Sequence, residues 1–205
     1  MAVVGAGAVG LTLAGRLAQH GAGVDLFEAA VTPEHIGSRA ICMQRETLEI
    51  WARLGIGDDI AARGIQWRTG RTYLRGRELF SIELPGNRED HFPPFVNVSQ
   101  SEVEERLLER VERLGVRIHR GYQFIGLAQE TDGVIATFAA EAGEMAHRSS
   151  FLVGTDGAHS SVRHAIGMGF PGHTFEDRFL IADIRADLPF ANERHFHFDP
   201  PWNPG

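Results

Sequence analysis

A glycine-rich turn close to the start of the chain places the strongest constraint on its fold. In MAVVGAGAVGLTLAGRLAQHGAGVDLFE, Gly5, Gly7 and Gly10 stand between a short apolar run and a segment whose apolar residues have helical spacing. After a strand, the first glycine of such a turn permits the tight bend, the second lets the backbone approach a pyrophosphate, and the third lets the helix pack closely on the sheet. The free N–H groups at the start of that helix then face the phosphates.

An acidic residue supports the same interpretation. Glu28 follows the next apolar run and lies 18 positions after Gly10 (28 − 10), close to the spacing at which an acid bonds a ribose hydroxyl. A carboxylate there disfavours the 2′-phosphate of NADP. The segment therefore predicts a dinucleotide site, with a purely structural glycine turn as the alternative. These residues do not separate FAD from NAD, because both bind through this adenosine-side geometry.

The order of the elements indicates an α/β fold. We expect strands over residues 1–4 and 24–27 with a helix over 8–20 between them, and this crossover implies a parallel sheet. Ser101 and Glu104 have the spacing of a capping box at the start of a later helix. No partner is evident for the last strand. The other expected elements are helices over 46–54, 101–114 and 160–166, a hairpin over 72–84, and strands over 116–119, 122–128, 133–139, 151–153 and 195–198.

Composition argues against several classes of function. The net charge is −7, whereas a nucleic-acid surface usually needs clustered basic residues. No apolar run reaches the roughly 18 residues of a membrane span, so we expect no membrane partner. All 20 basic residues are Arg, so the chain has no lysine for a P-loop, a Schiff base or a Tyr/Lys hydride-transfer pair. Cys42 is the single cysteine, which excludes an intramolecular disulfide, and we expect a reducing cytoplasmic location.

Two groups of polar residues are assigned ordinary roles. Several arginines recur on the helix predicted over 101–114, but glutamates are interleaved with them. A salt-bridged, solvated face is therefore expected rather than a basic patch. His195 and His197 alternate on one strand, as metal ligands can. Although Asp199 is close, no cysteine accompanies these histidines, and we expect no metal site.

A second polar motif, VGTDGAHSSVR, occupies residues 153–163. A strand end, an Asp-Gly turn and a helix led by serine can together form a second rim beside the glycine turn. The same residues also fit an Asx turn that leads into a helix N-cap, which is a common local structure. The local chemistry leaves both interpretations open.

Four segments resemble the single-component FAD-dependent aromatic hydroxylases of the para-hydroxybenzoate hydroxylase fold. They are GAGAVG with Glu28, SRA at 38–40, VSQSEVE at 98–104 and VGTDGAHSSVR at 153–163, in the order and spacing of that family. The final FHFDPPWNPG resembles the branch that hydroxylates 3-(3-hydroxyphenyl)propionate and related phenols. The resemblance implies an enzyme in which NAD(P)H reduces FAD and O₂ supplies the oxygen for a small aromatic substrate. The flavin, and no catalytic side chain, then carries the chemistry.

The resemblance also implies which residues contact the cofactor. The three glycines of the turn would hold the pyrophosphate, and Glu28 would bind the adenosine ribose. Arg39 would lie near the flavin and pyrophosphate, and Gln100 would lie on the flavin side of the cofactor. Asp156 would lie by the pyrophosphate and the approach of the nicotinamide, with Arg163 supporting its motif. The seven residues are Gly5, Gly7, Gly10, Glu28, Arg39, Gln100 and Asp156.

A division into domains follows from the same resemblance. We predict a Rossmann-like FAD- or NAD(P)-binding domain over residues 1–175, with a parallel sheet and inserted antiparallel strands that include a hairpin at about 65–98. Residues 176–205 would begin a β-rich substrate domain and leave it incomplete. The family's downstream Gly-Asp motif is not in this sequence, so we expect an N-terminal portion of a longer enzyme.

Other hypotheses stay open at this point. The chain could belong to another flavoenzyme on the same fold, such as a reductase or an epoxidase. It could also be an FAD-binding module without activity of its own. Association into a homodimer is likewise left open, because an exposed strand edge and Cys42 can both promote pairing of chains.

Overall fold

At the centre of the fold lies the parallel sheet that the sequence predicts. The computed structural model describes residues 1–32, 41–85, 91–176, 180, 189 and 191–202. The strand order is β12-β1-β2-β8, and each neighbouring pair is parallel. Because the strands run in one direction, the loops that follow β1, β2 and β12 emerge at one edge of the sheet. The strands are β1 (Ala2–Val4), β2 (Asp25–Glu28), β8 (Arg117–Arg120) and β12 (Leu152–Gly154).

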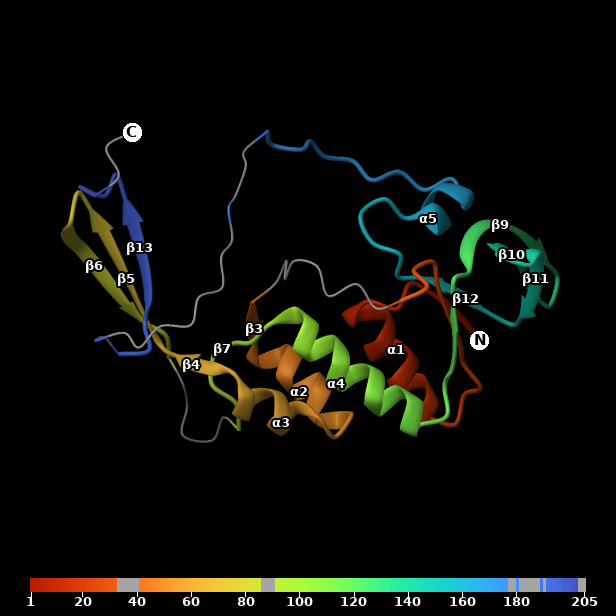
Figure 1. The fold of residues 1–205 in the computed structure, drawn as a ribbon, viewed down its shortest axis with the longest axis horizontal. Helices are drawn as coiled ribbons and strands as arrows, with labels where there is room; N and C mark the ends of the chain where they lie inside the picture. The colour runs from red at the N-terminus through yellow and green to blue at the C-terminus, as the bar shows by residue number, and fades with distance from the viewer. Residues whose placement is uncertain (33–40, 86–90, 177–179, 181–188, 190, 203–205) are drawn as a thin grey trace.

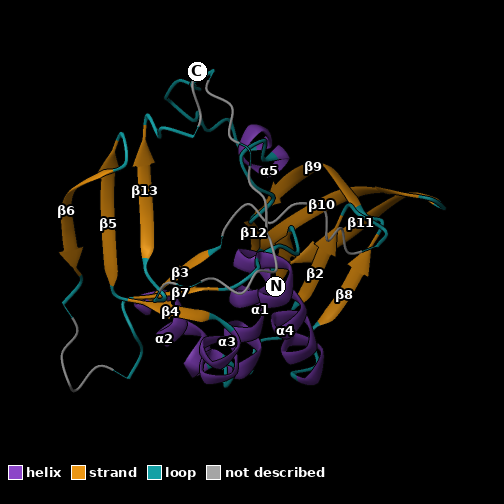
Figure 2. Cartoon of the chain, turned by 60° about the vertical axis from the view of Figure 1, so that its left-hand side comes forward, coloured by secondary structure: helices purple, strands orange, loops and turns teal. Residues whose placement is uncertain are grey.

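A layer of helices covers one face of this sheet (Figures 1 and 2). Helices α1 and α4 lie side by side, as do α2 and α3. Leu107 and Val111 of α4, one turn apart, are fully buried and share a cluster with Leu11 of α1. This spacing gives α4 one apolar face and leaves its charged residues on the other. The helices are α1 (Ala8–Gln19), α2 (Arg45–Arg53), α3 (Gly57–Arg63) and α4 (Gln100–Arg113).

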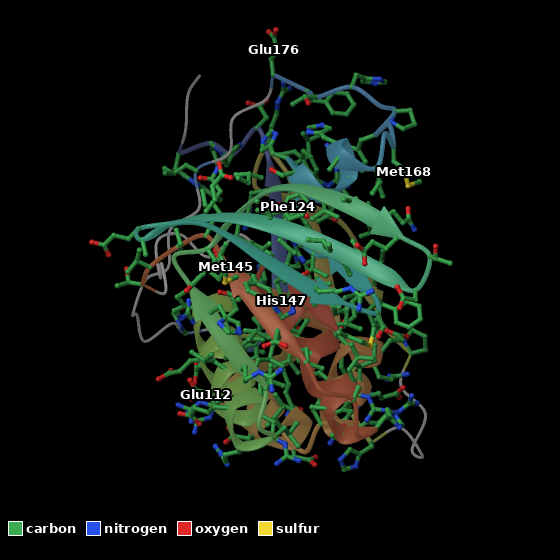
Figure 3. The ribbon with its side chains drawn as sticks, turned by 90° about the vertical axis from the view of Figure 1, so that its right-hand side faces the viewer. Glu112, Phe124, Met145, His147, Met168 and Glu176 are labelled. Atoms are coloured by element: carbon green, nitrogen blue, oxygen red, sulfur yellow. The ribbon has the colours of Figure 1, made fainter. Side chains whose placement is uncertain are left out.

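An antiparallel sheet of order β11-β10-β9 covers the opposite face. Because side chains alternate along a strand, Val3 faces the helices, whereas Val4 and Phe27 face this sheet. The rings of Phe27 and Phe138 stack with their centroids 4.1 Å apart. The strands are β9 (Gln123–Glu130), β10 (Gly133–Ala140) and β11 (Gly143–Ser149), and Figure 3 labels Phe124, Met145 and His147 on them.

A second three-stranded sheet, of order β13-β5-β6, stands at the far end of the molecule (Figure 1, left). Strand β13 is parallel to β5, with Arg194 opposite Gly70 and Phe198 opposite Leu74. The last strand therefore has a partner, contrary to the sequence-based expectation. The pairing was missed because Arg194 and Gly70 are 124 positions apart in the sequence (194 − 70). The domain boundary after residue 175 stays a prediction. The strands are β5 (Thr69–Leu74), β6 (Arg77–Glu83) and β13 (Arg194–Phe198).

Several short elements escaped the sequence analysis. Three strands form a small sheet of order β3-β7-β4 between the helices and the β13-β5-β6 sheet. Trp67 and Phe95 stack within it at a centroid distance of 4.9 Å. Strands of three residues are too short to show a periodic pattern, and α3 and β11 were missed as well. The three strands are β3 (Cys42–Gln44), β4 (Ile65–Trp67) and β7 (Phe95–Asn97).

The starts of two helices test the capping predictions. The capping box at Ser101 is wrong: α4 begins at Gln100 after the N-cap Ser99, and no side chain bonds the cap. The hydroxyl oxygens of Ser99 and Ser101 lie 2.7 Å apart instead. By contrast, α5 (Ser161–Ala165) starts as predicted, with Ser160 Oγ accepting from the N–H of Arg163. No helix in the described part of the chain has both the length and the apolar character needed to cross a bilayer.

Candidate functional site

The glycine turn joins β1 to α1 and packs against the second polar motif. Gly5 has a φ of +100°, and a Cβ there would lie 2.6 Å from the carbonyl oxygen of Thr155. A Cβ on Gly10 would lie 1.8 Å from the carbonyl oxygen of Gly5. No side chain fits at these distances, so the fold itself requires both glycines.

Gly7 differs from its two neighbours in the motif. Its φ is −74°, and apart from its chain neighbours and the nearby backbone of α1, Oε1 of Glu104 is the one described atom within 4 Å of its Cβ position, at 3.9 Å. Gly7 is the N-cap of α1, which has no side chain bonded at the cap and no acidic residue in its first turn. The first N–H groups of a helix lack intrahelical partners and attract anions. The open flank of Gly7 and the uncapped helix therefore fit a pyrophosphate.

Glu28 lies at the carboxyl end of β2, beside the turn. Its two carboxylate oxygens accept hydrogen bonds from the backbone N–H groups of Ala6 at 2.7 Å and Ala30 at 2.9 Å. The first of these bonds ties the glycine turn to β2. The predicted acid is thus brought next to the predicted glycines, and the N–H donors hold it in a fixed orientation.

A cleft of about 410 Å³ opens beside this turn. It extends from β2 across the start of α1 to α4. Among its described lining residues three are acidic and one is basic, so the cleft itself is negatively charged. They are Ala6, Gly7, Leu11, Glu28, Ala30, Thr32, Glu104, Glu105, Leu108 and Arg120.

The second motif packs against the glycine turn through the motif's own backbone and the hydroxyl group of Thr155. Thr155 Oγ1 lies 2.8 Å from the carbonyl oxygen of Val4 and 2.9 Å from that of Gly5. The Asp156 carboxylate accepts from Ser160 Oγ at 2.5 Å and from the N–H of Ser161 at 2.6 Å. The side chain of Asp156 therefore caps α5, as the local interpretation predicts, while its backbone lies against the turn.

Of the two remaining predicted cofactor residues, the structure describes Gln100. Gln100 opens α4, and its Nε2 donates to Glu104 Oε1 at 2.8 Å. Gln100 lines a second cleft, of about 600 Å³, on the α2 side of α1. Arg163 Nη1 donates to the carbonyl oxygen of Ala158 at 2.9 Å and so braces the turn before α5. The predicted role of Arg39, within the SRA segment, lies outside the described residues.

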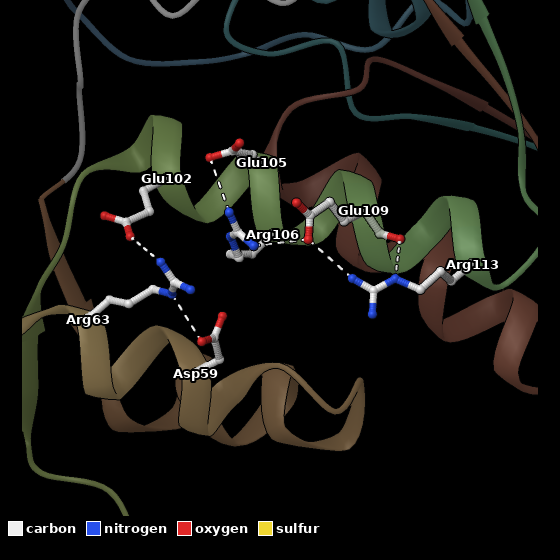
Figure 4. A network of polar contacts seen from close by, with 7 residues as sticks. All are labelled: Asp59, Arg63, Glu102, Glu105, Arg106, Glu109 and Arg113. Carbon is white, nitrogen blue, oxygen red and sulfur yellow. Dashed lines mark hydrogen bonds and ion pairs between the residues drawn. The ribbon is translucent and has the colours of Figure 1, made fainter.

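The charged face of α4 is salt-bridged, as predicted (Figure 4). Arg63 of α3 bonds Asp59 at 3.0 Å and Glu102 of α4 at 3.3 Å. Glu109 accepts from Arg106 at 3.0 Å and from Arg113 at 3.1 Å. Each of these arginines is therefore paired with at least one carboxylate. Over the described ranges, no three or more His, Cys, Asp or Glu side chains are grouped to hold a metal ion.

Two side chains at the site were given no role there by the sequence analysis. Thr155 joins the two motifs, and its position directly before Asp156 was the one indication available. Glu104 was assigned to a capping box, yet it faces Gly7 and accepts from Gln100. Its spacing from Gln100, four residues along one helix, could have suggested this pair.

Known proteins with related sequences decide the family. Residues 1–199 match the FAD binding domain family. The chain belongs to this family. A flavin-dependent monooxygenase of Mycobacteroides abscessus is 33% identical over 196 residues, which cover 90% of this chain and 41% of that protein. The 3-(3-hydroxy-phenyl)propionate/3-hydroxycinnamic acid hydroxylase of Comamonas testosteroni is 29% identical over 201 residues, which cover 97% of this chain and 34% of that protein.

A solved structure agrees with this assignment. The p-nitrophenol 4-monooxygenase PnpA of Pseudomonas putida DLL-E4 superposes with a TM-score of 0.75 and 27% identity, over 85% of this chain and 45% of that one. The predicted family, the α/β fold and FAD as the cofactor are confirmed. The chain spans only about two fifths or less of the length of the two curated relatives named above.

Proposed function

We propose that this chain is the N-terminal, FAD-binding portion of a monooxygenase that hydroxylates a phenolic or other small aromatic substrate. The observation that carries the proposal is the glycine turn of a chain in the FAD binding domain family. There, Gly5 and Gly10 are enclosed by the protein, while a Cβ on Gly7 would have only ordinary contact with Glu104 at 3.9 Å. Bound FAD supplies the transfer of electrons from NAD(P)H and the activation of O₂. The residues of this chain bind and orient the cofactor.

The proposed contacts follow the cleft from one end to the other. The N–H groups at the start of α1 hold the pyrophosphate beside Gly7, where Gly5 and Gly10 allow the tight turn. Asp156 keeps α5 against this turn, near the pyrophosphate and the approach of the nicotinamide. Arg39, for which only the family resemblance argues, adds a positive charge near the flavin and pyrophosphate.

Glu28 is proposed to bind the adenosine ribose. An ionised carboxylate accepts about four hydrogen bonds, and the backbone donors of Ala6 and Ala30 use two of them. Each oxygen therefore keeps capacity for a ribose hydroxyl. The two N–H bonds also fix the carboxylate before the ligand arrives, which lowers the entropic cost of binding.

Gln100 is proposed to contact the flavin side of the cofactor. The second cleft, which it lines, is mostly apolar, with Val9, Met43 and Trp51 among its walls. An apolar wall with a few polar groups suits a planar ring system, and such a wall keeps water away from the ring. The side-chain amide of Gln100 supplies a polar contact at the edge of this wall.

The substrate class and the domain division belong to the same proposal. The activity named for the Comamonas testosteroni relative and the resemblance of the final FHFDPPWNPG support a phenol with a short acidic side chain. We assign residues 1–175 to the FAD-binding domain and 176–205 to the start of a substrate domain. A homodimer is included in the proposal because, within the described residues, β6 and β13 each have one unpaired edge.

A second candidate function is a module that binds FAD without turning over a substrate. The fraction of the relatives' length that the chain spans, 41% or less, favours it for this chain taken alone. Detectable phenol-dependent oxidation of NAD(P)H by the 205-residue chain would contradict this candidate.

The visible absorption spectrum of the purified chain, before and after addition of FAD and desalting, tests the proposal. We expect retained flavin at about one per chain. The same chain extended to the full length of its relatives should oxidise NAD(P)H only when a phenol is present, with a hydroxylated product. A reduced alkene or an epoxide as the product would identify a different flavoenzyme. A chain that retains no flavin in either length would overturn the proposal.

A further inference from the structure

We propose that Glu104 is the anion that lies beside the phosphate-binding start of α1 in the cofactor-free chain, and that its charge limits the affinity for FAD. This inference rests on the proposed function, because it concerns the same cleft. Oε1 of Glu104 lies 3.9 Å from the Cβ position of Gly7 and is the one described atom within 4 Å that belongs neither to the chain neighbours of Gly7 nor to the nearby backbone of α1. A negative charge at this point stabilises the uncapped helix and opposes a second anion.

The other two carboxylates of the cleft have different partners. Glu28 accepts two backbone N–H groups. Glu105 pairs with the guanidinium of Arg106 at 3.5 Å. Glu104 has no cation partner among the described residues, and its bond comes from the neutral amide of Gln100. Of the three, Glu104 is the one that has neither a cation partner nor a backbone N–H donor among the described residues and that approaches Gly7.

The bond from Gln100 gives Glu104 a fixed place between the two clefts. Glu104 lines the cleft beside Glu28, and Gln100 lines the cleft on the α2 side. The amide therefore holds the carboxylate toward Gly7, at the point where the pyrophosphate of an extended dinucleotide would pass. Glu104 thus acts on the cofactor directly, through its charge beside the phosphate path, and takes no part in any reaction.

A substitution that removes the charge of Glu104 but keeps the shape of its side chain should raise the affinity for FAD and lower the melting temperature of the cofactor-free chain. In Glu104→Gln the new amide oxygen can still accept from Gln100. We expect this variant to bind FAD about three- to tenfold more tightly than the wild type, because a like charge is removed from the path of the pyrophosphate. The cofactor-free variant should melt about 1 to 4 °C lower, because the helix start loses its anion.

Ionic strength separates charge from packing. We would titrate FAD by quenching of its fluorescence at about 0.02 M and about 0.5 M salt. The advantage of Glu104→Gln should shrink to less than about twofold at the higher salt, where the repulsion is screened. Glu104→Ala removes the charge and also releases the Gln100 amide, so its gain in affinity should be smaller than that of the Gln variant.

Glu112→Gln provides the matched control. Glu112 lies on the same helix, is exposed and does not line the cleft (Figure 3). It carries the same change of charge and should leave the FAD affinity within about twofold of the wild type. Equal or weaker FAD binding by Glu104→Gln, in a wild type that binds FAD, would overturn this inference and leave the proposed function intact. So would a gain that does not respond to salt. Absence of FAD binding in every variant would contradict both proposals.

Discussion

The parallel sheet and the β13-β5-β6 sheet bury their side chains to different degrees. In β1 all three residues are buried, with Ala2 and Val3 at 0% exposure. In β6 all seven residues are exposed, with Phe80 at 52% and Ile82 at 54%. The parallel sheet lies between a helical layer and an antiparallel sheet, whereas the apolar face of the other sheet has no such cover in the described chain. Apolar side chains on a strand therefore become a buried core only where other layers of secondary structure cover the faces of the sheet.

The two faces of the β13-β5-β6 sheet also differ from each other. On one face the ring of Tyr73 stacks on those of His195 at 5.5 Å and His197 at 4.6 Å, and Arg71 pairs with Glu193. The other face forms an apolar hollow of about 480 Å³. Its contribution to stability is small while it stays open to water. The hollow is lined by Thr72, Leu74, Leu79, Phe80, Ile82, Phe196 and Phe198.

The largest effect on the free energy of unfolding is expected when a methyl group is added at Gly10, in the turn after β1 of the parallel sheet. In Gly10→Ala the new Cβ would meet the carbonyl oxygen of Gly5 at 1.8 Å and Thr155 Oγ1 at 2.7 Å. The backbone of the turn must move to admit it. We expect a loss of more than about 4 kcal/mol in the free energy of unfolding, measured by urea denaturation followed by circular dichroism.

Two other glycines show whether this cost comes from the site or from any added methyl group. Among the described residues beyond the neighbouring chain, Gly7→Ala meets only Glu104 at 3.9 Å and Gly23→Ala meets no atom within 4 Å. Both variants should unfold within about 1 kcal/mol of the wild type. Gly7→Ala alone should weaken FAD binding, by about tenfold or more, because it fills the flank proposed for the pyrophosphate. A Gly7→Ala variant as unstable as Gly10→Ala would contradict the distinction drawn between these glycines.

The next largest loss of unfolding free energy is expected when a buried aromatic ring is removed between the parallel and antiparallel sheets. Phe138 is fully buried and stacks on Phe27, so Phe138→Ala should cost about 3–5 kcal/mol of unfolding free energy. Urea denaturation at pH 7 measures the change. A loss of less than about 1 kcal/mol would mean that the antiparallel sheet does not share one core with the parallel sheet.

Local patterns explain why part of this architecture was predictable. The glycine turn, α1 and the flanking strands β1 and β2 follow from residues that are neighbours in sequence, where spacing alone indicates structure. The β5–β13 pairing joins Gly70 to Arg194, and no local pattern encodes a contact of that separation. β11, Gly143–Ser149, reads GEMAHRS and contains no β-branched residue, so its strand character comes from pairing with β10.

The candidate site divides in the same way. Gly5, Gly10 and Glu28 were found because the turn and its acid form one continuous unit. Gln100 and Asp156 depended on a family resemblance, since each also has an ordinary structural role as a helix start or a cap. Glu104 was misassigned because a serine three residues before a glutamate fits a capping box, and only the three-dimensional structure shows that α4 begins earlier.

A smaller effect is expected at the junction between the parallel and antiparallel sheets. Asp25 is 6% exposed, and hydrogen bonds from Arg117 at 2.6 and 2.7 Å lower the pKa of its carboxyl group from 3.8 to about 2. The folded state therefore favours the ionised form. This stabilisation is present above pH 4 and should disappear as the pH falls from about 4 to about 2, with a loss of about 2 kcal/mol. Urea denaturation across that range measures it.

Substitution tests whether Asp25 is the group responsible. Asp25→Asn should be less stable at pH 7 and should flatten the dependence on acid. His147, on β11, has its pKa lowered from 6.5 by burial, so its neutral form stabilises the fold above that value and the contribution falls as the pH drops below it. Asp132→Asn, at an exposed pair with Arg148, is the control and should leave the acid profile unchanged. An unchanged profile in Asp25→Asn would assign the acid transition to other groups.

The smallest effect is expected on the open face of the β13-β5-β6 sheet. Phe80→Ala removes a ring of the same type as that of Phe138, but half of the side chain is already in water. We expect a loss of less than about 1 kcal/mol, because little apolar area leaves the solvent on folding. The same substitution should reduce self-association of the chain in sedimentation velocity, because exposed apolar strand faces promote contact between molecules. A cost comparable to that of Phe138→Ala would show that the face is covered in solution, and the contrast between the two sheets would then not hold.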